Sequence, residues 1–235
     1  MKGKHIAFII ALVVIADQAL KLYIKTHFTL DFPGNHRNVL GEKFQLYFVE
    51  NPGMAYGWKF GGNWGKLALT VFRMGAVVFG TWYLGSIIKQ RYNTGFIICA
   101  ALIYAGALGN LIDSCFYGLI FDKGMVFDPQ INEYTGYNGL ASFTKHGYSS
   151  FLHGNVVDML YFPVLHGHFP TWFPFWGGED FIFFRPIFNI ADASISTGVI
   201  TILVFQKIFF KHRHTQVIEH TVETKALVDD ASQVS

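Results

Sequence analysis

The chain has 235 residues, of which 51% are hydrophobic, 17% aromatic and only 14% charged, and its formal net charge is +2. This composition is too apolar for an ordinary soluble domain, and so small a charge excludes a general affinity for nucleic acid. The two cysteines, Cys99 and Cys115, lie in or directly after apolar runs. They are expected to be free packing thiols, which excludes a disulfide framework and a CxxC metal site.

Four apolar segments are each long enough to cross a bilayer, which takes about 20 residues for a hydrocarbon core of roughly 30 Å. They cover residues 5–24, 64–87, 95–113 and 189–210. The first could instead be a cleaved signal peptide, but Asp17 and Lys21 would be unusual in such a segment and three more spans follow. The sequence therefore predicts an α-helical membrane protein with four transmembrane helices.

The basic residues favour one orientation of these helices, because lysine and arginine near helix ends collect on the cytoplasmic side. Three clusters share a side if both termini are cytoplasmic: Lys2 with Lys4, Lys89 with Arg91, and Lys207 with Lys211 and Arg213. We therefore expect cytoplasmic termini, outer loops at 25–63 and 114–188, and a polar cytoplasmic tail at 214–235.

The two outer loops differ in pattern. In the first, alternation over Gln45–Val49 before an Asn-Pro-Gly turn predicts a strand, and hence a small extracytoplasmic β-element. The second is a long loop rich in Gly, Phe and Tyr without a helical period. Residues 118–154 within it are expected to form a mobile lid, the alternative being a surface decoration without contact to a site.

Polar residues converge on the outer side of the predicted membrane region. Gly106, Asn110 and Asp113 are spaced to lie on one face of the third helix, which should end at the outer surface. The fourth helix begins at the same surface. Further polar or turn-forming positions expected near that surface are Asp17, Lys21, Asn51, Gly53, Asp158, Asn189 and Asp192.

Two carboxylates brought close at a membrane edge cannot both ionise at low cost, so one keeps a proton while the other stays charged. Such a pair can hydrolyse an amide: the ionised Asp takes a proton from water, and the protonated Asp polarises the carbonyl and then protonates the leaving nitrogen. A proton-coupled transporter, with Asp113 and Asp192 as a relay, is the alternative. No histidine spacing fixes three ligands, so neither a metal nor another cofactor is expected.

The chain resembles the lipoprotein signal peptidases, also called signal peptidase II, over roughly residues 14–200. The resemblance is carried by DQALK at 17–21, ENPGMAYG at 50–57, GALGNLID at 106–113 with VVD at 156–158, and FNIADAS at 188–194. It implies an aspartic endopeptidase of the bacterial inner membrane, occupying residues 1–213 as one domain, with an extracytoplasmic β-cradle and active site. Such enzymes remove signal peptides from prolipoproteins just before the diacylglyceryl-modified cysteine. The resemblance also implies contact with membrane lipid and inhibition by globomycin.

The resemblance further implies roles for single residues. The catalytic pair of the family falls on Asp158 and Asp192, and supporting positions fall on Asp17, Lys21, Asn51, Gly53, Asn110, Asp113 and Asn189. The chain departs from the family pattern at Ser114, where an arginine is common, and Arg185 is a candidate substitute. It also has 42 residues, 114–155, between NLID and VVD, where the family commonly has a short turn.

Overall fold

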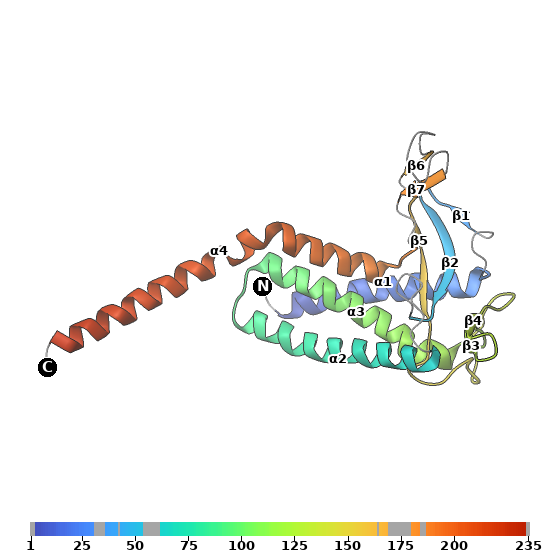
Figure 1. Cartoon of the computed structure of the whole chain (residues 1–235), viewed down its shortest axis with the longest axis horizontal. Helices are drawn as coiled ribbons and strands as arrows, with labels where there is room; N and C mark the ends of the chain where they lie inside the picture. Colours follow the sequence, from blue (N-terminus) through green and yellow to red (C-terminus); the bar gives the residue numbers. More distant parts are fainter. Residues whose placement is uncertain are drawn as a thin grey trace.

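The computed structural model describes residues 3–30, 36–41, 43–53, 62–163, 165–168, 180–183 and 187–233. Its helices form a bundle with a β-sheet standing at one end (Figure 1). The helices are α1 (Gly3–His27), α2 (Gly62–Lys89), α3 (Thr94–Ile120) and α4 (Ile190–Gln233). Helix α3 packs against each of the other three, and α1 also contacts α4. Helix α3 is therefore the centre of the bundle.

The four predicted spans are confirmed. In the described part of the chain, four helical stretches are long and apolar enough to cross a membrane: Gly3–His27, Trp64–Lys89, Thr94–Ile120 and Ile190–Lys211. The predicted end of the third span at Asp113 was wrong, because α3 continues to Ile120. Asp113 is paired with Lys21 inside the bundle and so does not have to mark the membrane surface. The polar segment from residue 214 also continues α4, as far as Gln233.

Glycines on α3 allow the neighbouring helices to approach it closely. A Cβ atom on Gly106 would lie 2.2 Å from the backbone oxygen of Ala191, in the first turn of α4. A Cβ atom on Gly109 would lie 2.8 Å from Oδ2 of Asp17 on α1. Small residues at helix crossings are common in membranes, where close van der Waals packing must replace the hydrophobic effect between helices. These two positions bring the polar residues of α1 and α4 against α3.

The predicted strand over Gln45–Val49 is confirmed as part of a small antiparallel sheet. Its three strands are β1 (Arg37–Asn38), β2 (Gln45–Asn51) and β5 (Val156–Tyr161), with β2 in the middle. In the register of β2 and β5, Val49 lies opposite Asp158 and Asn51 opposite Val156. Two hairpins follow elsewhere, formed by β3 (Val126–Asp128) with β4 (Glu133–Thr135) and by β6 (Leu165–His168) with β7 (Asp180–Phe183).

A buried cluster joins the sheet to the C-terminal ends of α1 and α3. It consists of Ile24, Phe28, Phe48, Tyr117, Phe121, Ala141, Val157 and Met159. Because Val157 and Met159 flank Asp158 on β5, this packing fixes the strand that carries the VVD motif. The sheet is therefore held to the helices by apolar contacts directly beside the aspartate.

The segment after α3 is packed against that helix, where the sequence had predicted an irregular loop. The backbone N–H groups of Tyr148, Ser149 and Gly154 donate to the carbonyls of Phe121, Gly118 and Ser114, at 2.9, 2.9 and 2.8 Å. Gly118 lies in the last turn of α3, whose carbonyls have no partner within the helix, so the bond from Ser149 satisfies one of them. The returning chain thus closes the helix before it enters β5.

The close approach at Gly106 leads to a testable prediction. Gly106→Ala should destabilise the protein and reduce its activity, because the new methyl group must displace the first turn of α4. Gly85→Ala, at a position with nothing within 4 Å of the added Cβ, is the matched control. Alanine is favoured over glycine in a helix by up to about 1 kcal/mol, so the control should be neutral or stabilised. Thermal unfolding of both variants in detergent tests this, and equal melting temperatures would contradict it.

Candidate active site

The two aspartates expected to act together come from different elements that meet beside α3. Asp158 lies within β5, and Asp192 lies in the first turn of α4. The side chain of Asn189, just before α4, accepts a 2.8 Å hydrogen bond from the backbone N–H of Asp192. Asparagine at this position is a strong helix start signal. The helix dipole places a partial positive charge at this end of α4, beside Asp192.

Two asparagine side chains connect the carboxylates. Asn189 donates through Nδ2 to Oδ1 of Asp158 at 2.7 Å. Asn110 on α3 donates through Nδ2 to Oδ1 of Asp192 at 2.8 Å. The two amides are themselves linked, because Asn189 Nδ2 also lies 3.2 Å from Oδ1 of Asn110. The structure thus brings together four predicted residues from GALGNLID, VVD and FNIADAS, and the amides fix the positions of both acids.

The two acids differ in their burial and in the charges around them. Asp158 is 5% exposed. Burial, and next the negative charge of Asp192, raise the pKa of Asp158 to about 8, although Lys21 and the hydrogen bond from Asn189 oppose the rise. Asp158 therefore holds its proton at neutral pH. Asp192 is less buried and stands at a helix N-terminus, so the two acids lie in different environments.

A buried ion cluster supports the pair from behind. Lys21 Nζ lies 2.8 Å from Oδ2 of Asp17 and 2.8 Å from Oδ2 of Asp113. It also donates to Oδ1 of Asn110 at 2.9 Å. Asp17 in turn accepts from the backbone N–H of Ala191 at 2.9 Å, which ties α1 to the start of α4. Asp17 and Lys21, one helical turn apart on α1, thus form an ion pair. Asp113 belongs to the same cluster.

The remaining predicted positions form a turn at the end of β2. Oδ1 of Asn51 accepts from the backbone N–H of Gly53 at 2.9 Å, and Gly53 has a positive φ of 104°. This backbone conformation strongly favours glycine. In the register of the two strands, Asn51 lies opposite Val156, which is two residues before Asp158 on β5. The rest of that motif, residues 54–57, lies outside the described residues.

Sequence reasoning missed two polar contributors. Gln18 on α1 donates through Nε2 to Oδ1 of Asp113 at 2.8 Å. Arg73 on α2 donates through Nη1 to Oγ of Ser114 at 2.9 Å. An ionisable residue in the middle of the predicted span 64–87 was the available signal for Arg73. Arg185, the substitute suggested by the sequence, lies outside the described residues.

The described part of the chain contains no group of three or more His, Cys, Asp or Glu side chains placed to hold a metal ion. The candidate site holds two carboxylates, from β5 and from α4, and amide side chains position both at the end of the membrane-spanning helices where the sheet lies. This combination defines an aspartic protease embedded in a membrane.

Comparisons with known proteins identify the family. A family model described as Signal peptidase (SPase) II matches residues 9–209. The lipoprotein signal peptidase of Porphyromonas gingivalis strain ATCC 33277 is 43% identical over 204 residues, which are 86% of this chain and 83% of the relative. That of Amoebophilus asiaticus is 31% identical over 230 residues, 94% of this chain and 89% of the relative. The chain belongs to the signal peptidase II family.

A solved structure agrees with this result. A bacterial membrane enzyme has 25% sequence identity and a TM-score of 0.52, with coverage of 87% of this chain and 89% of the other. The predicted fold class and the aspartic endopeptidase activity inferred from the sequence are confirmed by the family and the four-helix architecture. The comparisons do not support the transporter alternative, because the matching relatives are lipoprotein signal peptidases.

The raised pKa of Asp158 predicts how cleavage depends on pH. The group is protonated below about pH 8 and ionised above it, so a reaction that needs its proton should slow as the pH rises through that value. The measurement is kcat/KM for a prolipoprotein substrate from about pH 5 to pH 10, with thermal unfolding recorded at each pH as a control for stability. A rate that stays constant to pH 10 would contradict the assignment of the proton donor.

Proposed function

We propose that Asp158 and Asp192 are the catalytic pair with which this membrane protease cuts prolipoproteins just before the diacylglyceryl-modified cysteine. The observation that carries the proposal is the chain of amides from Asp158 through Asn189 and Asn110 to Asp192. It supports two acids with different protonation states on one side of the central helix. The family of the chain supports the substrate class.

In the proposed reaction, Asp192 is ionised and takes a proton from the attacking water. Asp158 donates its proton in a hydrogen bond to the oxygen of the scissile carbonyl, which makes the carbon easier to attack. The resulting tetrahedral intermediate breaks at the C–N bond when a proton is transferred from the acid pair to the cysteine nitrogen. The products are the carboxyl end of the signal peptide and the amino group of the modified cysteine.

The supporting residues have distinct roles in this proposal. Asn110 and Asn189 hold the carboxylates in place, and Asp17, Lys21 and Asp113 hold the helices that carry them. The turn of Asn51 and Gly53, at the end of β2, is available to bind substrate main chain near Asp158. Because glycine there tolerates a close approach of another backbone, the turn suits an extended peptide.

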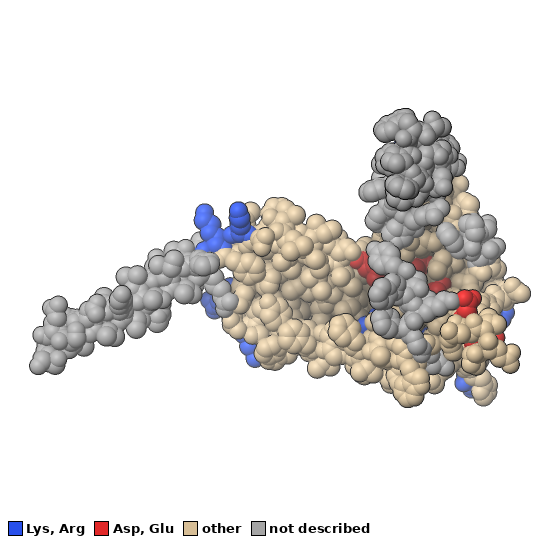
Figure 2. Space-filling view, in the orientation of Figure 1, with Lys and Arg blue, Asp and Glu red and all other residues tan. Residues whose placement is uncertain are grey.

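The proposed setting is the bacterial inner membrane, with both termini in the cytoplasm and the carboxylates on the extracytoplasmic side. Figure 2 shows several lysine and arginine side chains at the end of the bundle away from the sheet and others at the opposite end, with acidic side chains near the junction with the sheet. The basic end includes Lys89, Arg91, Lys207 and Lys211. This distribution supports the orientation, since basic residues favour the cytoplasmic side. Exposed apolar side chains on α2 and α4, such as Phe72, Val78 and Leu203, support contact with lipid. Inhibition by globomycin is part of the same proposal.

Substitution of the two acids tests the proposal. Asp158→Asn and Asp192→Asn should each reduce cleavage of a diacylglyceryl-modified prolipoprotein by about 100-fold or more, since asparagine keeps the shape but cannot exchange the proton. Glu133→Gln, the same type of change on the exposed strand β4, should retain normal turnover. Purified variants with normal melting temperatures are compared. Near-normal turnover in either aspartate variant would disprove the pair.

Thiol labelling tests the orientation. Single cysteines at the exposed positions Gly41, Asn138 and Gln90 are introduced into a variant that lacks Cys99 and Cys115. In whole cells with a permeable outer membrane, a membrane-impermeant thiol reagent should label the first two positions and not the third. Gln90 should become labelled only after the inner membrane is opened. Labelling of Gln90 alone in intact cells would show the opposite orientation.

A further inference from the structure

The position of Arg73 suggests a function that the aspartate pair does not account for. We propose that Arg73 is a substrate-binding residue, whose guanidinium reaches from α2 to hold a main-chain carbonyl of the prolipoprotein beside the bond that Asp158 and Asp192 cut. This inference depends on the proposed function, because it concerns the substrate of the same site. The inference makes α2 a part of the active centre. None of the sequence motifs quoted above lies on this helix.

Arg73 lies where a charge is costly. It is 11 residues after Gly62, the start of α2, and at 1.5 Å per residue this places its Cα about 16 Å along the helix. It is half-buried in a helix whose neighbouring positions, Val71, Phe72 and Met74, are exposed apolar side chains. An ionisable residue at such a depth in a membrane helix is retained when it serves a polar partner or a ligand.

The guanidinium is held by a serine and not by a carboxylate. Arg73 Nη1 donates to Ser114 Oγ at 2.9 Å, and Ser114 Oγ donates to the backbone oxygen of Asn110 at 2.9 Å. Ser114 is 1% exposed, so it is a fixed anchor on α3. This bond is the only one that the guanidinium makes with the described residues. A guanidinium has five N–H donors, so most of its donors remain for a ligand.

The charge of Arg73 is nevertheless directed at the site. Its strongest attraction is to Asp192, followed by Asp113 and Asp158. None of the three lies within ion-pair distance of it, as Asp113 is already bound by Lys21. A cation that is attracted by the acids without forming an ion pair with them can bind a neutral polar group such as a peptide carbonyl. The planar guanidinium can bind such oxygens with two donors at once.

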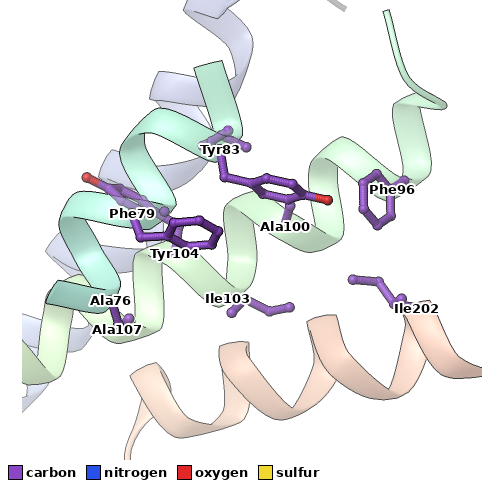
Figure 3. Close-up of a pocket in the computed structure, with 11 residues that line it drawn as sticks. Ala76, Phe79, Tyr83, Phe96, Ala100, Ile103, Tyr104, Ala107 and Ile202 are labelled. Carbon is purple, nitrogen blue, oxygen red and sulfur yellow. The ribbon is translucent and has the colours of Figure 1, made fainter. Parts of the chain in front are cut away.

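An apolar cavity of about 340 Å³ is lined by residues of α2, α3 and α4. Ala76 and Gly80 follow Arg73 by three and seven residues on α2, and Ala107 precedes Ser114 by seven residues on α3. These residues line the cavity together with Ile202 of α4, as the close-up in Figure 3 shows for the three helices. A prolipoprotein lying along this face would place apolar groups in the cavity and main-chain carbonyls beside Arg73.

Kinetics of four variants test the proposal. Arg73→Met should lower kcat/KM for a diacylglyceryl-modified prolipoprotein peptide by roughly 10- to 100-fold, the loss expected for a hydrogen bond from a charged donor. The effect should appear mainly in KM, with an unchanged melting temperature. Arg73→Lys should recover only part of it, because an ammonium cannot donate in a fork. The exchange variant Arg73→Ser/Ser114→Arg should recover most of it, since the cation then enters the same space from α3. Lys89→Met, at the exposed end of the same helix, is the control.

The outcomes separate this inference from the proposed function. If the unmodified protein does not cleave the peptide, or Asp158→Asn still does, the proposed function fails and this inference fails with it. If cleavage depends on Asp158 but Arg73→Met has normal KM and kcat, only the role of Arg73 is disproved. Arg73→Met could also lose activity together with a lowered melting temperature, without recovery in the exchange variant. That result would disprove the role of Arg73 in substrate binding, because Arg73 would then only connect α2 to α3.

Discussion

The structure depends on one buried interaction, the placement of Lys21 between Asp17 and Asp113. The three side chains are at most 1% exposed, so none of their charges is stabilised by water. A buried charge of this kind is tolerated only when ion pairs and hydrogen bonds satisfy its polar atoms. Here Gln18, the backbone of Ala191 and the side chain of Asn110 provide these bonds. Among the described residues, no buried side-chain nitrogen or oxygen lacks a partner. Because the cluster joins α1, α3 and the start of α4, it determines where the side chains of the proposed catalytic pair can lie.

A second buried pair explains how the long insertion is accommodated. Lys25 pairs with Glu50 of β2, and its ammonium is surrounded by the rings of Phe48, Phe121, Tyr137 and Tyr148 at 4.9–5.6 Å from their centroids. Glu50 also accepts from Tyr137 Oη at 2.9 Å and from the backbone N–H of Met125 at 2.8 Å. These contacts attach the inserted residues to α1 and the sheet. The insertion therefore adds structure at the C-terminal end of α3. The spacing of the two carboxylates depends instead on Asn110 and Asn189.

The two carboxyl groups of the site lie in different environments, because the site is formed where the sheet meets the membrane helices. Asp158 is enclosed by packed residues of the sheet and keeps a proton, whereas Asp192 is less buried and lies in the first turn of α4. The proposed role of Arg73 fits the same principle, since a cation near hydrocarbon interacts with the acids at longer range than it would in water. The departure at Ser114 then has a physical meaning: the serine gives up the positive charge on α3 and anchors a positive charge that comes from α2.

The sequence alone was sufficient for the membrane spans, the strand over Gln45–Val49 and the set of polar residues at the site. These features are local: a span needs only a run of apolar residues, and Asn110 and Asp113 share a helix face by spacing. Tertiary structure decided what depends on partners distant in the chain. Helix α3 passes Asp113 because Lys21, 92 residues earlier, neutralises that carboxylate. The segment after it is packed because Tyr148, Gly154 and Glu50 satisfy groups that no local pattern connects. Arg73 meets Ser114 because two neighbouring helices face each other there, and a hydropathy profile does not record which way a side chain points.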